Sequence, residues 1–363
     1  MESITKEWTP TEVHDWEGKE RSVLVLNYTM ACALACDFCC YGCNPRRKEK
    51  MPIALARRLI IEASELNQFS SVAFTGGEPL LFPEEIIDLA STAKERSVPF
   101  TIATACHWAE NYNYTYTLLK ELKDLGLIRL NVSHDPSHEV FVHRDCILNV
   151  AKASEELGLA TYIVGTFSNP NINMNSYLPE VVAFSHVELI TKFVAKVGMA
   201  KKWDISQEKY NLDLSVEDLC CYRRIHHDIV VWHDGKVYPC CSTFNRSTRG
   251  LEIGNANNIS LDKIWDLVEG SLLYRIMKRK GFGELYNLIR ERKPELYALL
   301  PNPDLSVGPC SLCNSIFRDR YISQEIFKVF SEYESEKVAL AVEKVVQLIG
   351  ENKTTELMKR CLK

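Results

Sequence analysis

A dense group of cysteines lies near the start of the chain, in the stretch CALACDFCCYGCN from Cys32 to Asn44. Cys32, Cys36 and Cys39 are spaced as C-x3-C-x2-C, and three thiolates on one short loop can hold three irons of a [4Fe-4S] cube. The fourth iron would keep an open position for a small molecule. A zinc loop is the alternative, although it usually pairs C-x2-C with a second nearby pair that completes four ligands.

The composition indicates a globular chain in which such thiols stay reduced. Its 363 residues are 46% hydrophobic, which is enough for a large core. A net charge of -5 provides no basic footprint for nucleic acid and no polybasic membrane segment. Because the N-terminal stretch is polar and acidic and no signal or transmembrane segment is found, we expect a cytoplasmic protein without nucleic-acid or membrane partners. Clustered cysteines there are usually metal ligands or reactive thiols.

From residue 22 onward, short apolar segments rich in β-branched residues alternate with longer amphipathic segments. The short segments predict buried parallel strands at residues 22–29, 71–79, 100–105, 128–135, 161–168 and 187–195. The amphipathic segments, with apolar residues at i, i+3 and i+4, predict helices at residues 53–67, 83–97, 115–126 and 147–158. Gly126 and Gly158 are expected to end the last two helices.

Six β/α units in a row predict right-handed crossovers and a parallel sheet that is closed or nearly closed into a barrel. Eight units would complete the barrel, so the expected α/β fold is a partial (β/α)6 barrel of the TIM type. In such sheets the chemistry lies at the carboxyl ends of the strands. The cysteine loop follows the first predicted strand and therefore lies where this rule requires it.

The sequence pattern changes after about residue 200. Residues 228–241 contain two short predicted strands around an Asp234-Gly235 turn, which is a hairpin signal. Helical patterns follow at residues 260–279 and 322–360, the latter as one or two helices. We therefore expect a smaller C-terminal α+β domain, and the predicted bounds are 1–21 for an N-terminal extension, 22–200 for the barrel, 201–320 for the second domain and 321–363 for C-terminal helices.

Two motifs together resemble those of the radical SAM superfamily. The cysteine loop has the form C-x3-C-x-aromatic-C, with Phe38 as the aromatic residue, and GGEP at Gly76–Pro79 ends the second predicted strand. The likeness covers residues 22 to about 200. Two motifs in this order and at consecutive strand ends are highly specific, whereas GGEP alone would be weak.

The resemblance implies how cofactors are held and used. Cys32, Cys36 and Cys39 would ligate the cluster, and its open iron would chelate S-adenosylmethionine. The residues expected around that molecule are Phe38, Gly76, Gly77, Glu78, Pro79 and Ser133. An electron from a donor such as flavodoxin or ferredoxin would split the sulfonium, giving methionine and a 5′-deoxyadenosyl radical that abstracts a hydrogen atom. Capping of a strand end is the alternative role of Ser133.

A second set of cysteines resembles the SPASM and twitch extensions of radical SAM enzymes. Thirteen residues separate Cys221 from Gly235, and four separate Gly235 from Cys240. After a long gap, Cys310 and Cys313 form a C-x2-C pair. GNANNISLDKIW at residues 254–265 resembles a segment that is usual between them. Only Cys361 remains downstream, which favours the twitch type with one auxiliary [4Fe-4S] cluster over a SPASM domain with two. A rubredoxin-like or zinc ribbon site is the alternative for the expected ligands Cys220, Cys240, Cys310 and Cys313.

The Cys220-Cys221 doublet and the CDFCCYGC run look most like the radical SAM peptide epimerases that make D-residues in ribosomal epipeptides. In that family one thiol beside the auxiliary cluster donates a hydrogen atom. The resemblance implies a RiPP maturase, an isomerase that converts L- to D-residues in a ribosomally synthesised precursor peptide. Cys221 would be the hydrogen donor and Cys220 the ligand, and the reverse assignment fits nearly as well.

Other functions stay open. The same fold could form a thioether, a carbon-carbon bond or a cyclopropane in a peptide. It could also dehydrogenate a small molecule, with the auxiliary cluster receiving the second electron. Outside enzymology, the cysteines could build an iron-sulfur or zinc scaffold that binds a partner.

Several residues near these motifs are not needed as ligands. For Cys40, Cys43 and Cys241 the sequence gives no firm role, although the first two could pack against the cluster, relay electrons or tune its potential. Cys146 and Cys361, on helical segments, are expected to be small core hydrophobes. Solvated loop residues are the preferred interpretation of His134, His138 and His143. NPRRKEK at residues 44–50 is interpreted as a solvated basic turn rather than a dock for an acidic leader peptide.

Overall fold

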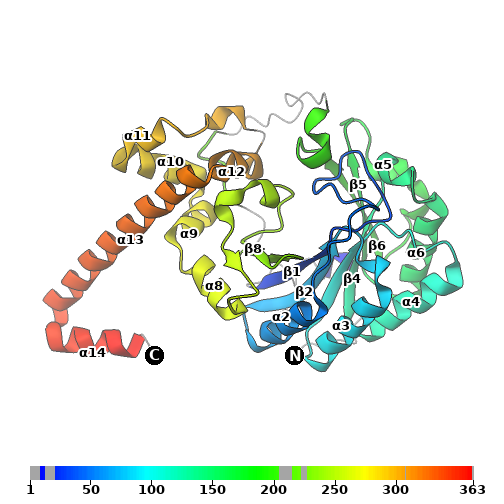
Figure 1. Ribbon diagram of the computed structural model, residues 1–363, viewed down its shortest axis with the longest axis horizontal. Coiled ribbons are helices and arrows are strands. Elements are labelled where there is room, and N and C mark those ends of the chain that lie inside the picture. Colours follow the sequence, from blue (N-terminus) through cyan, green and yellow to red (C-terminus); the bar gives the residue numbers. More distant parts are fainter. Residues whose placement is uncertain (1–8, 13–20, 204–214, 222–226, 307, 362–363) are drawn as a thin grey trace. The chain divides into compact units, whose positions relative to one another are not determined.

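The computed structural model describes residues 9–12, 21–203, 215–221, 227–306 and 308–361, so most of the predicted N-terminal extension lies outside the described residues. Six strands pair in parallel, each with the next along the chain, in the curved sheet of Figure 1. The predicted α/β class with its parallel sheet is thereby confirmed. The strands are β1 (Ser22–Thr29), β2 (Phe69–Gly76), β3 (Phe100–Thr104), β4 (Leu127–Ser133), β5 (Thr161–Phe167) and β6 (Val187–Phe193).

Burial along the strands follows their place in the sheet. All eight residues of β1 are buried, as expected for a central strand covered on both faces. In β6, by contrast, Val187 alone is buried and polar residues such as Glu188 and Lys192 are not. Since β6 is an edge strand, these polar and charged side chains also discourage pairing with another sheet.

Helices cross between successive strands and cover one face of the sheet (Figure 1). Each buries an apolar stripe, such as Leu55, Leu59 and Ala63 in the first of them. Gly158 ends the last at a φ of 60°, a left-handed conformation that glycine adopts without steric cost. The four helices are α2 (Ile53–Glu65), α3 (Pro83–Glu95), α4 (Tyr112–Asp124) and α6 (Arg144–Leu157).

The predicted hairpin exists and extends the barrel sheet. Strands β7 (Ile229–Trp232) and β8 (Lys236–Tyr238) pair in antiparallel fashion around the Asp234-Gly235 turn. Strand β7 also pairs in parallel with β1, and β9 (Gly254–Asn255) pairs with β8, which gives the order β6-β5-β4-β3-β2-β1-β7-β8-β9. Nothing in the sequence pattern predicts the pairing of β7 with β1.

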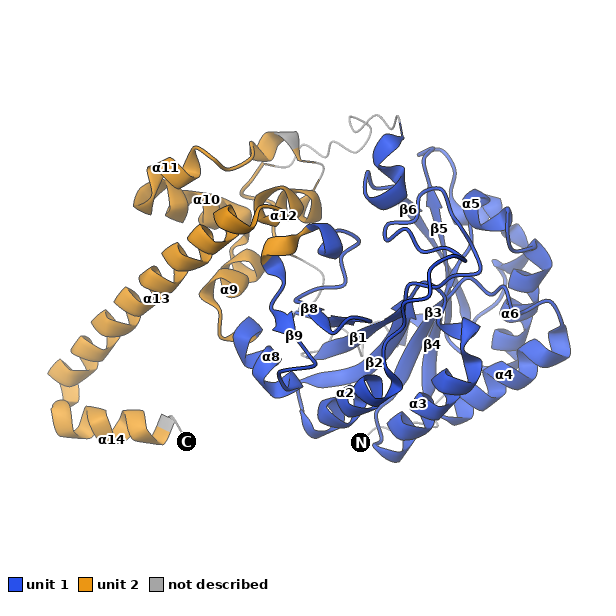
Figure 2. Ribbon diagram, viewed as in Figure 1, with its two compact units in different colours: residues 1–212, 222–247, 251–268 blue, residues 213–221, 248–250, 269–363 orange. Residues whose placement is uncertain are grey.

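The chain divides into two compact units that do not follow sequence order (Figure 2). Unit 1 consists of residues 1–212, 222–247 and 251–268, and unit 2 of residues 213–221, 248–250 and 269–363. The hairpin therefore belongs with the barrel in terms of contacts. The domain bounds expected from the sequence are a different kind of division and stay a prediction.

The C-terminal part is helical, and two breaks divide the helices expected there. Gly270 and Ser271 separate α8 (Leu261–Glu269) from α9 (Leu272–Arg279). Gly350 separates α13 (Arg320–Ile349) from α14 (Glu351–Cys361). The remaining helices of unit 2 are α10 (Gly281–Arg292), α11 (Pro294–Tyr297) and α12 (Pro309–Phe317).

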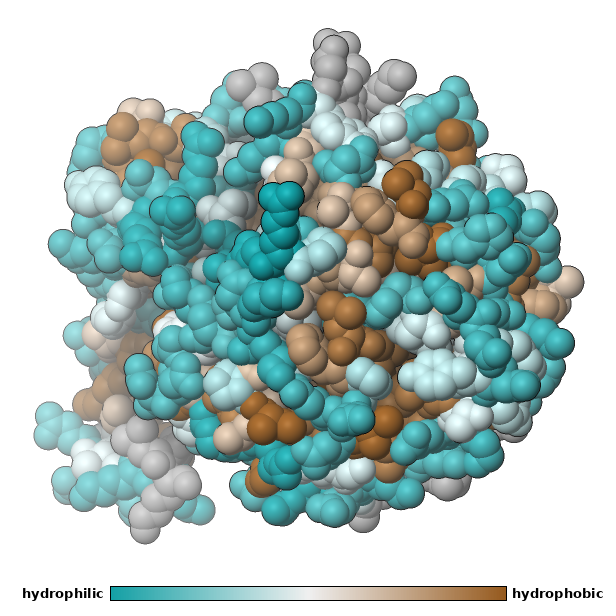
Figure 3. Space-filling view, turned by 45° about the vertical axis from the view of Figure 1, so that its right-hand side comes forward, coloured by the Kyte–Doolittle hydropathy of each residue, from teal (hydrophilic) through white to brown (hydrophobic). Residues whose placement is uncertain are grey.

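Hydrophilic side chains cover most of the face drawn in Figure 3, and hydrophobic side chains gather in smaller areas between them. Among the described helices, none combines the length and the hydropathy that crossing a membrane would require.

Candidate functional site

The cysteine loop leaves the end of β1 and is closed at its base. Thr29 forms a β-bridge with Lys50, and Ala31 forms one with Asn44. The Met30 amide donates to the Glu49 carbonyl oxygen over 2.8 Å. These contacts hold the two ends of the loop together, so the cysteines project from the carboxyl edge of the sheet on a short, fixed segment.

Three predicted cluster ligands line one cavity of about 200 Å³. The cavity lies over the carboxyl ends of β2, β3, β4 and β5, and the strands contribute Thr75 to Gly77, Ala103 to Ala105, Ser133 and Thr166. The structure thus brings together the predicted site residues Cys32, Cys36, Phe38, Cys39, Gly76, Gly77 and Ser133. This set of thiols and backbone groups has the donor chemistry that a [4Fe-4S] cluster and its bound molecule require.

The thiols of the loop have unequal environments. Burial, partly offset by the Leu34 amide, raises the pKa of Cys32 to about 12. A hydrogen bond from Cys43, helped by backbone amides and opposed by burial, lowers the pKa of Cys39 to about 6. Of these two sulfurs, Cys39 is therefore the one whose surroundings favour the thiolate, the form that binds metal.

The GGEP turn packs directly against the segment that leads into the cysteine loop. The Gly77 amide donates to the Thr29 carbonyl oxygen over 2.6 Å, and the Glu78 amide donates to the Ala31 carbonyl oxygen over 2.8 Å. A Cβ on Gly76 would overlap the Thr29 carbonyl oxygen, and one on Gly77 would overlap that of Ala31. Both glycines are required for this close approach.

Glu78 has a different place from the two glycines. Its side chain is fully buried, and it accepts hydrogen bonds from the Leu80 amide (3.0 Å), the Thr104 hydroxyl (3.0 Å) and the Ala105 amide (2.7 Å). It does not line the cavity. The carboxylate therefore holds the turn to the end of β3, and the cofactor-binding role expected for Glu78 and Pro79 stays a prediction.

The preferred interpretation of the histidines is wrong for two of the three. His134 is fully buried, and neither ring nitrogen has a hydrogen-bond partner among the residues that the structure describes. Burial lowers its pKa to about 4, so its ring is neutral at pH 7. His138 lines the cavity and bonds to Asp135, with 13% of its side chain exposed. Only His143, with 78% of its side chain exposed, is the solvated residue that was expected.

Asp135 and His138 are two further residues of the site that the sequence motifs do not identify as such. Both belong to the short helix α5 (Pro136–Glu139) and its N-cap, directly after β4. Burial alone would lower the pKa of His138, but hydrogen bonds to Asp135 and Cys36 outweigh it and raise the pKa to about 10. The available signal was Asp135 before Pro136, which is typical of a helix start at a strand end.

The additional thiols of unit 1 lie close to the same loop. Cys43 is buried in a core cluster with Trp232 and Tyr238, and Cys39 and Cys241 pack against that cluster. Cys40 lines the cavity, and burial raises its pKa to about 12. Separately, Cys146 is buried on α6, which confirms the core role expected for it, whereas the side chain of Cys361 lies outside the described residues.

Four of the predicted site cysteines, Cys220, Cys221, Cys310 and Cys313, belong to unit 2. The Cys221 amide donates to the Met277 carbonyl oxygen of α9 over 3.0 Å, and the Phe282 amide donates to the Leu219 carbonyl oxygen over 2.7 Å. These bonds fix the Cys220-Cys221 doublet against the junction of α9 and α10. Cys310 and Cys313 lie three residues apart in the first turns of α12, and hence on one side of that helix.

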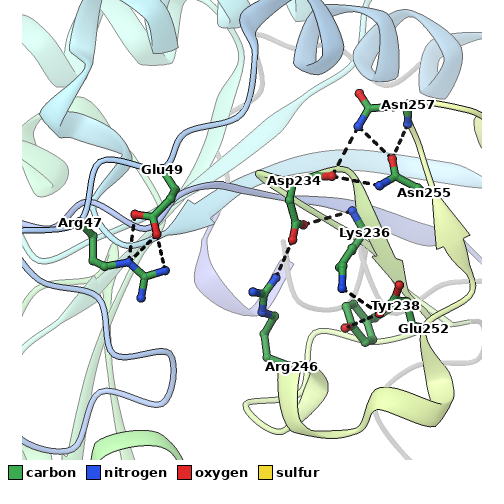
Figure 4. Close-up of polar contacts among 9 residues, drawn as sticks. All are labelled: Arg47, Glu49, Asp234, Lys236, Tyr238, Arg246, Glu252, Asn255 and Asn257. Atoms are coloured by element: carbon green, nitrogen blue, oxygen red, sulfur yellow. Dashed lines mark hydrogen bonds and ion pairs between the residues drawn. The ribbon is translucent and has the colours of Figure 1, made fainter. Parts of the chain in front are cut away.

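Cys240 follows β8 and belongs to unit 1. The adjacent hairpin turn is closed by two asparagines of the GNANN segment, as Figure 4 shows. Asn255 and Asn257 donate side-chain hydrogen bonds to the Asp234 carbonyl oxygen over 3.1 and 3.4 Å. A Cβ on Gly235 would overlap both asparagines. The GNANN segment therefore shapes the turn that precedes Cys240.

The basic stretch at residues 44–50 is internally paired (Figure 4). The Arg47 guanidinium contacts both carboxylate oxygens of Glu49, at 2.8 and 2.9 Å from Nε. Both side chains are partly exposed. This arrangement supports the interpretation of the stretch as a solvated turn.

Two family models match the chain, the radical SAM superfamily over residues 26–163 and the iron-sulfur cluster-binding SPASM domain over residues 220–281. The chain is similar to YydG of Bacillus subtilis (strain 168), whose name assigns it to peptide biosynthesis. The identity is 25% over 322 residues, which cover 86% of this chain and 97% of YydG.

Solved structures with a similar chain course include BtrN in complex with AdoMet and 2-DOIA, with a TM-score of 0.46, 16% identity and coverage of 73% of this chain and 90% of BtrN. A second is anSMEcpe with bound AdoMet and a Cp18Cys peptide, with a TM-score of 0.47, 13% identity and coverage of 89% and 99%.

The two matched families account for the cofactors expected from the sequence. A radical SAM domain uses a [4Fe-4S] cluster with S-adenosylmethionine, and the second domain holds an auxiliary iron-sulfur cluster. Cysteine-rich segments lie in both matched regions, and the first set lines a cavity at the carboxyl edge of the sheet. The chain therefore contains a radical SAM domain followed by an iron-sulfur cluster-binding SPASM domain.

Proposed function

We propose that this enzyme epimerises L- to D-residues in a ribosomally synthesised peptide. Similarity to YydG over 97% of that protein supports a peptide substrate, because the name of YydG assigns it to peptide biosynthesis. The observation that carries epimerisation is the Cys220-Cys221 doublet, which supplies one thiol more than a four-cysteine auxiliary cluster needs. An epimerase requires such a thiol, whereas an enzyme that forms a cross-link does not.

In the first half-reaction, different residues of the chain would hold the cluster, orient S-adenosylmethionine and exclude water. Cys32, Cys36 and Cys39 would hold the cluster, and the backbone of Gly76 and Gly77 with Ser133 would orient S-adenosylmethionine in the same cavity. When bound and reduced by one electron, the cofactors supply a 5′-deoxyadenosyl radical that takes a hydrogen atom from a peptide Cα. Apolar lining residues such as Leu34 and Phe38 would exclude water from this step.

The second half-reaction needs a hydrogen atom from the opposite face of the planar Cα radical. A cysteine S–H bond breaks homolytically, the hydrogen atom bonds to Cα with inverted configuration, and a thiyl radical remains. One electron and one proton then restore the thiol. Electrons for both steps would come from a flavodoxin- or ferredoxin-type donor, and the auxiliary cluster is suited to pass one to the thiyl radical.

We assign the hydrogen donor to Cys221 and the ligand to Cys220. Both are half-buried, and the backbone of this segment is fixed to α9 and α10 through Cys221 and Leu219. Such a rigid segment suits either role, so the reverse assignment is the second candidate. Variants of the two residues separate the candidates, because loss of a ligand removes iron and loss of a donor does not.

The decisive experiment is mass spectrometry of the substrate peptide after anaerobic turnover in D2O with S-adenosylmethionine and reductant. The donor thiol exchanges with solvent, so epimerisation inserts one deuterium at one α-carbon and produces a D-residue. Cys221→Ala should keep both clusters and lose the D-product, whereas Cys220→Ala should lose auxiliary iron.

Other outcomes would point to the alternatives. Loss of two hydrogens from the peptide would mean a cross-link or dehydrogenation and would overturn the epimerase proposal. Full D-product from both alanine variants would overturn the donor assignment. Absence of 5′-deoxyadenosine from a protein that holds its clusters would leave only a scaffold.

A further inference from the structure

We infer that His138 is a positioning residue for the catalytic cluster, which it controls by donating an N–H···S hydrogen bond to the sulfur of Cys36. The inference rests on Cys36 being a cluster ligand, as proposed above, but not on epimerisation or on any particular peptide. His138 and Cys36 line the same cavity, and their side chains lie close enough to interact.

Asp135 sets which nitrogen of His138 faces the sulfur. Its Oδ1 lies 2.8 Å from His138 Nδ1. A carboxylate only accepts hydrogen bonds, so Nδ1 carries a hydrogen, and Nε2 is the nitrogen left for Cys36. The ring is thereby held between a carboxylate on one side and a ligand sulfur on the other, an arrangement that commonly orients groups around metal centres.

Asp135 is itself held in place by backbone hydrogen bonds. It is fully buried, and its Oδ1 accepts the amides of Ser137 (3.1 Å) and His138 (3.2 Å) as the N-cap of α5. Its Oδ2 accepts the Thr166 amide of β5 over 3.1 Å. The Asp135 carboxylate thus links the ends of β4 and β5, and its hydrogen bond to the imidazole fixes the ring relative to the sheet.

Helix α5 also contacts the cysteine loop beside Cys36. The Ser137 hydroxyl donates to Asp37 Oδ1 over 2.6 Å. The rings of His138 and Phe38 meet edge to face, with their centroids 5.6 Å apart. Three successive residues of the loop, from Cys36 to Phe38, are therefore in contact with one turn of helix, which makes the geometry at the sulfur reproducible.

A hydrogen bond to a ligand sulfur has a predictable electrochemical effect. Reduction adds one negative charge to the cluster, and a donor that points at a sulfur stabilises that charge. The midpoint potential is therefore higher with the His138 donor than without it. The cluster must receive an electron before S-adenosylmethionine can be cleaved. Because the His138 donor raises the midpoint potential, a weaker biological reductant would be sufficient to supply that electron.

Three substitutions separate this role from simple packing. His138→Gln places an amide N–H near the position of Nε2 and keeps a donor for Cys36. His138→Asn reaches only the position of Nδ1, so it keeps the contact with Asp135 and loses the donor. His138→Phe removes both. The matched control is His143→Asn, because His143 belongs to the same strand-to-helix connection and is solvent-exposed.

The measurement is an anaerobic redox titration of the reconstituted full chain, followed by electron paramagnetic resonance. The catalytic cluster is identified as the signal that added S-adenosylmethionine perturbs. We expect His138→Asn and His138→Phe to keep their iron while the reduced-to-oxidised ratio at a fixed potential falls about tenfold, a shift of about 59 mV for one electron. His138→Gln and His143→Asn should stay near the wild-type value.

Two results would overturn the inference. One is a wild-type potential in a fully loaded His138→Asn protein. The other applies if the Asn and Phe variants fail to load: His138→Gln, which keeps the donor, should then still load with a potential near wild type, and its failure to do so would make His138 a packing residue. Since no peptide is used, these results are independent of whether the enzyme is an epimerase.

Discussion

At the scale of single residues, neighbouring residues of the GGEP motif have different roles. Gly76 and Gly77 present backbone to the cavity, while Glu78, the next residue, directs its carboxylate to the Leu80 amide of the same turn and to two donors at the end of β3. A buried carboxylate with three hydrogen bonds is committed to the structure of the turn. The family motif therefore combines a binding surface with the support that shapes it.

Glu78→Gln tests this division. The amide nitrogen of Gln would have to face either the Leu80 amide or the Ala105 amide, so one buried donor would lose its acceptor. We expect the free energy of unfolding in urea to fall by about 1–3 kcal/mol, with little loss of affinity for S-adenosylmethionine. The control is Glu84→Gln, because Glu84 is an exposed residue in the first turn of α3.

The opposite pattern would assign Glu78 to the ligand. A lost charged hydrogen bond to the ammonium group of S-adenosylmethionine would weaken binding about tenfold or more while stability stayed near the wild-type value.

At the scale of elements, the cysteine loop is supported from several sides. Helix α5 contacts it through Ser137 and His138, and the GGEP turn packs against its first residues. The 3-10 helix η3 (Gly198–Lys202) contacts it as well, since the Met199 amide donates to the Cys39 carbonyl oxygen over 3.0 Å. These contacts fix the loop by means of segments far away in sequence.

Gly198→Ala should disturb the last of these contacts. Gly198 has a φ of +58°, and a Cβ there would overlap the carbonyl oxygens of Cys39 and Cys40. Gly350 is the matched control: its φ is +82°, but nothing lies within 4 Å of its ideal Cβ. Both alanine variants carry the backbone cost of a positive φ, roughly 1–3 kcal/mol, but only Gly198→Ala should also lose iron from the catalytic cluster. Equal iron content in the two variants would show that η3 does not support the loop.

At the scale of the whole molecule, strands from the segment that the SPASM model matches, β7, β8 and β9, belong to the same sheet as the barrel strands. Strand β7 pairs with Leu24 to Asn27 of β1, and Trp232 at its end is fully buried beside Cys43. The hairpin therefore protects the edge of the strand that leads into the cysteine loop. A barrel without it would expose that edge and part of its core.

Truncation tests this dependence. A chain that ends after residue 203 retains the six predicted strands but leaves β1 as an unprotected edge, so we expect most of it in the insoluble fraction. A chain that ends after residue 268 keeps β7, β8 and β9 and should be more soluble and hold more iron. Equal solubility and iron content in the two would mean that the β1–β7 pairing is dispensable for the barrel.

Local patterns were sufficient for much of the fold and part of the site. The six strands and four helices follow from hydrophobic periodicity, and the hairpin from an Asp-Gly turn, because each signal lies within a few neighbouring residues. The carboxyl-edge rule then predicted that the loop after β1 would meet the ends of the next strands. Cys32, Cys36, Cys39, Phe38 and Ser133 do line one cavity there.

Only the tertiary structure decided how distant segments meet. The spacing of residues in Asp135 to His138 gives no information about Cys36, a hundred residues earlier, and periodicity cannot tell which strand a hairpin will join. Burial turned His134 and His138 from expected loop residues into interior ones. The sequence by itself determined the cysteine chemistry and the barrel, since both depend on local spacing. Packing between elements decided the rest, namely the contacts of α5 and η3 with the cysteine loop, the β1–β7 pairing and the hydrogen bonds of Glu78. Local spacing does not encode such packing.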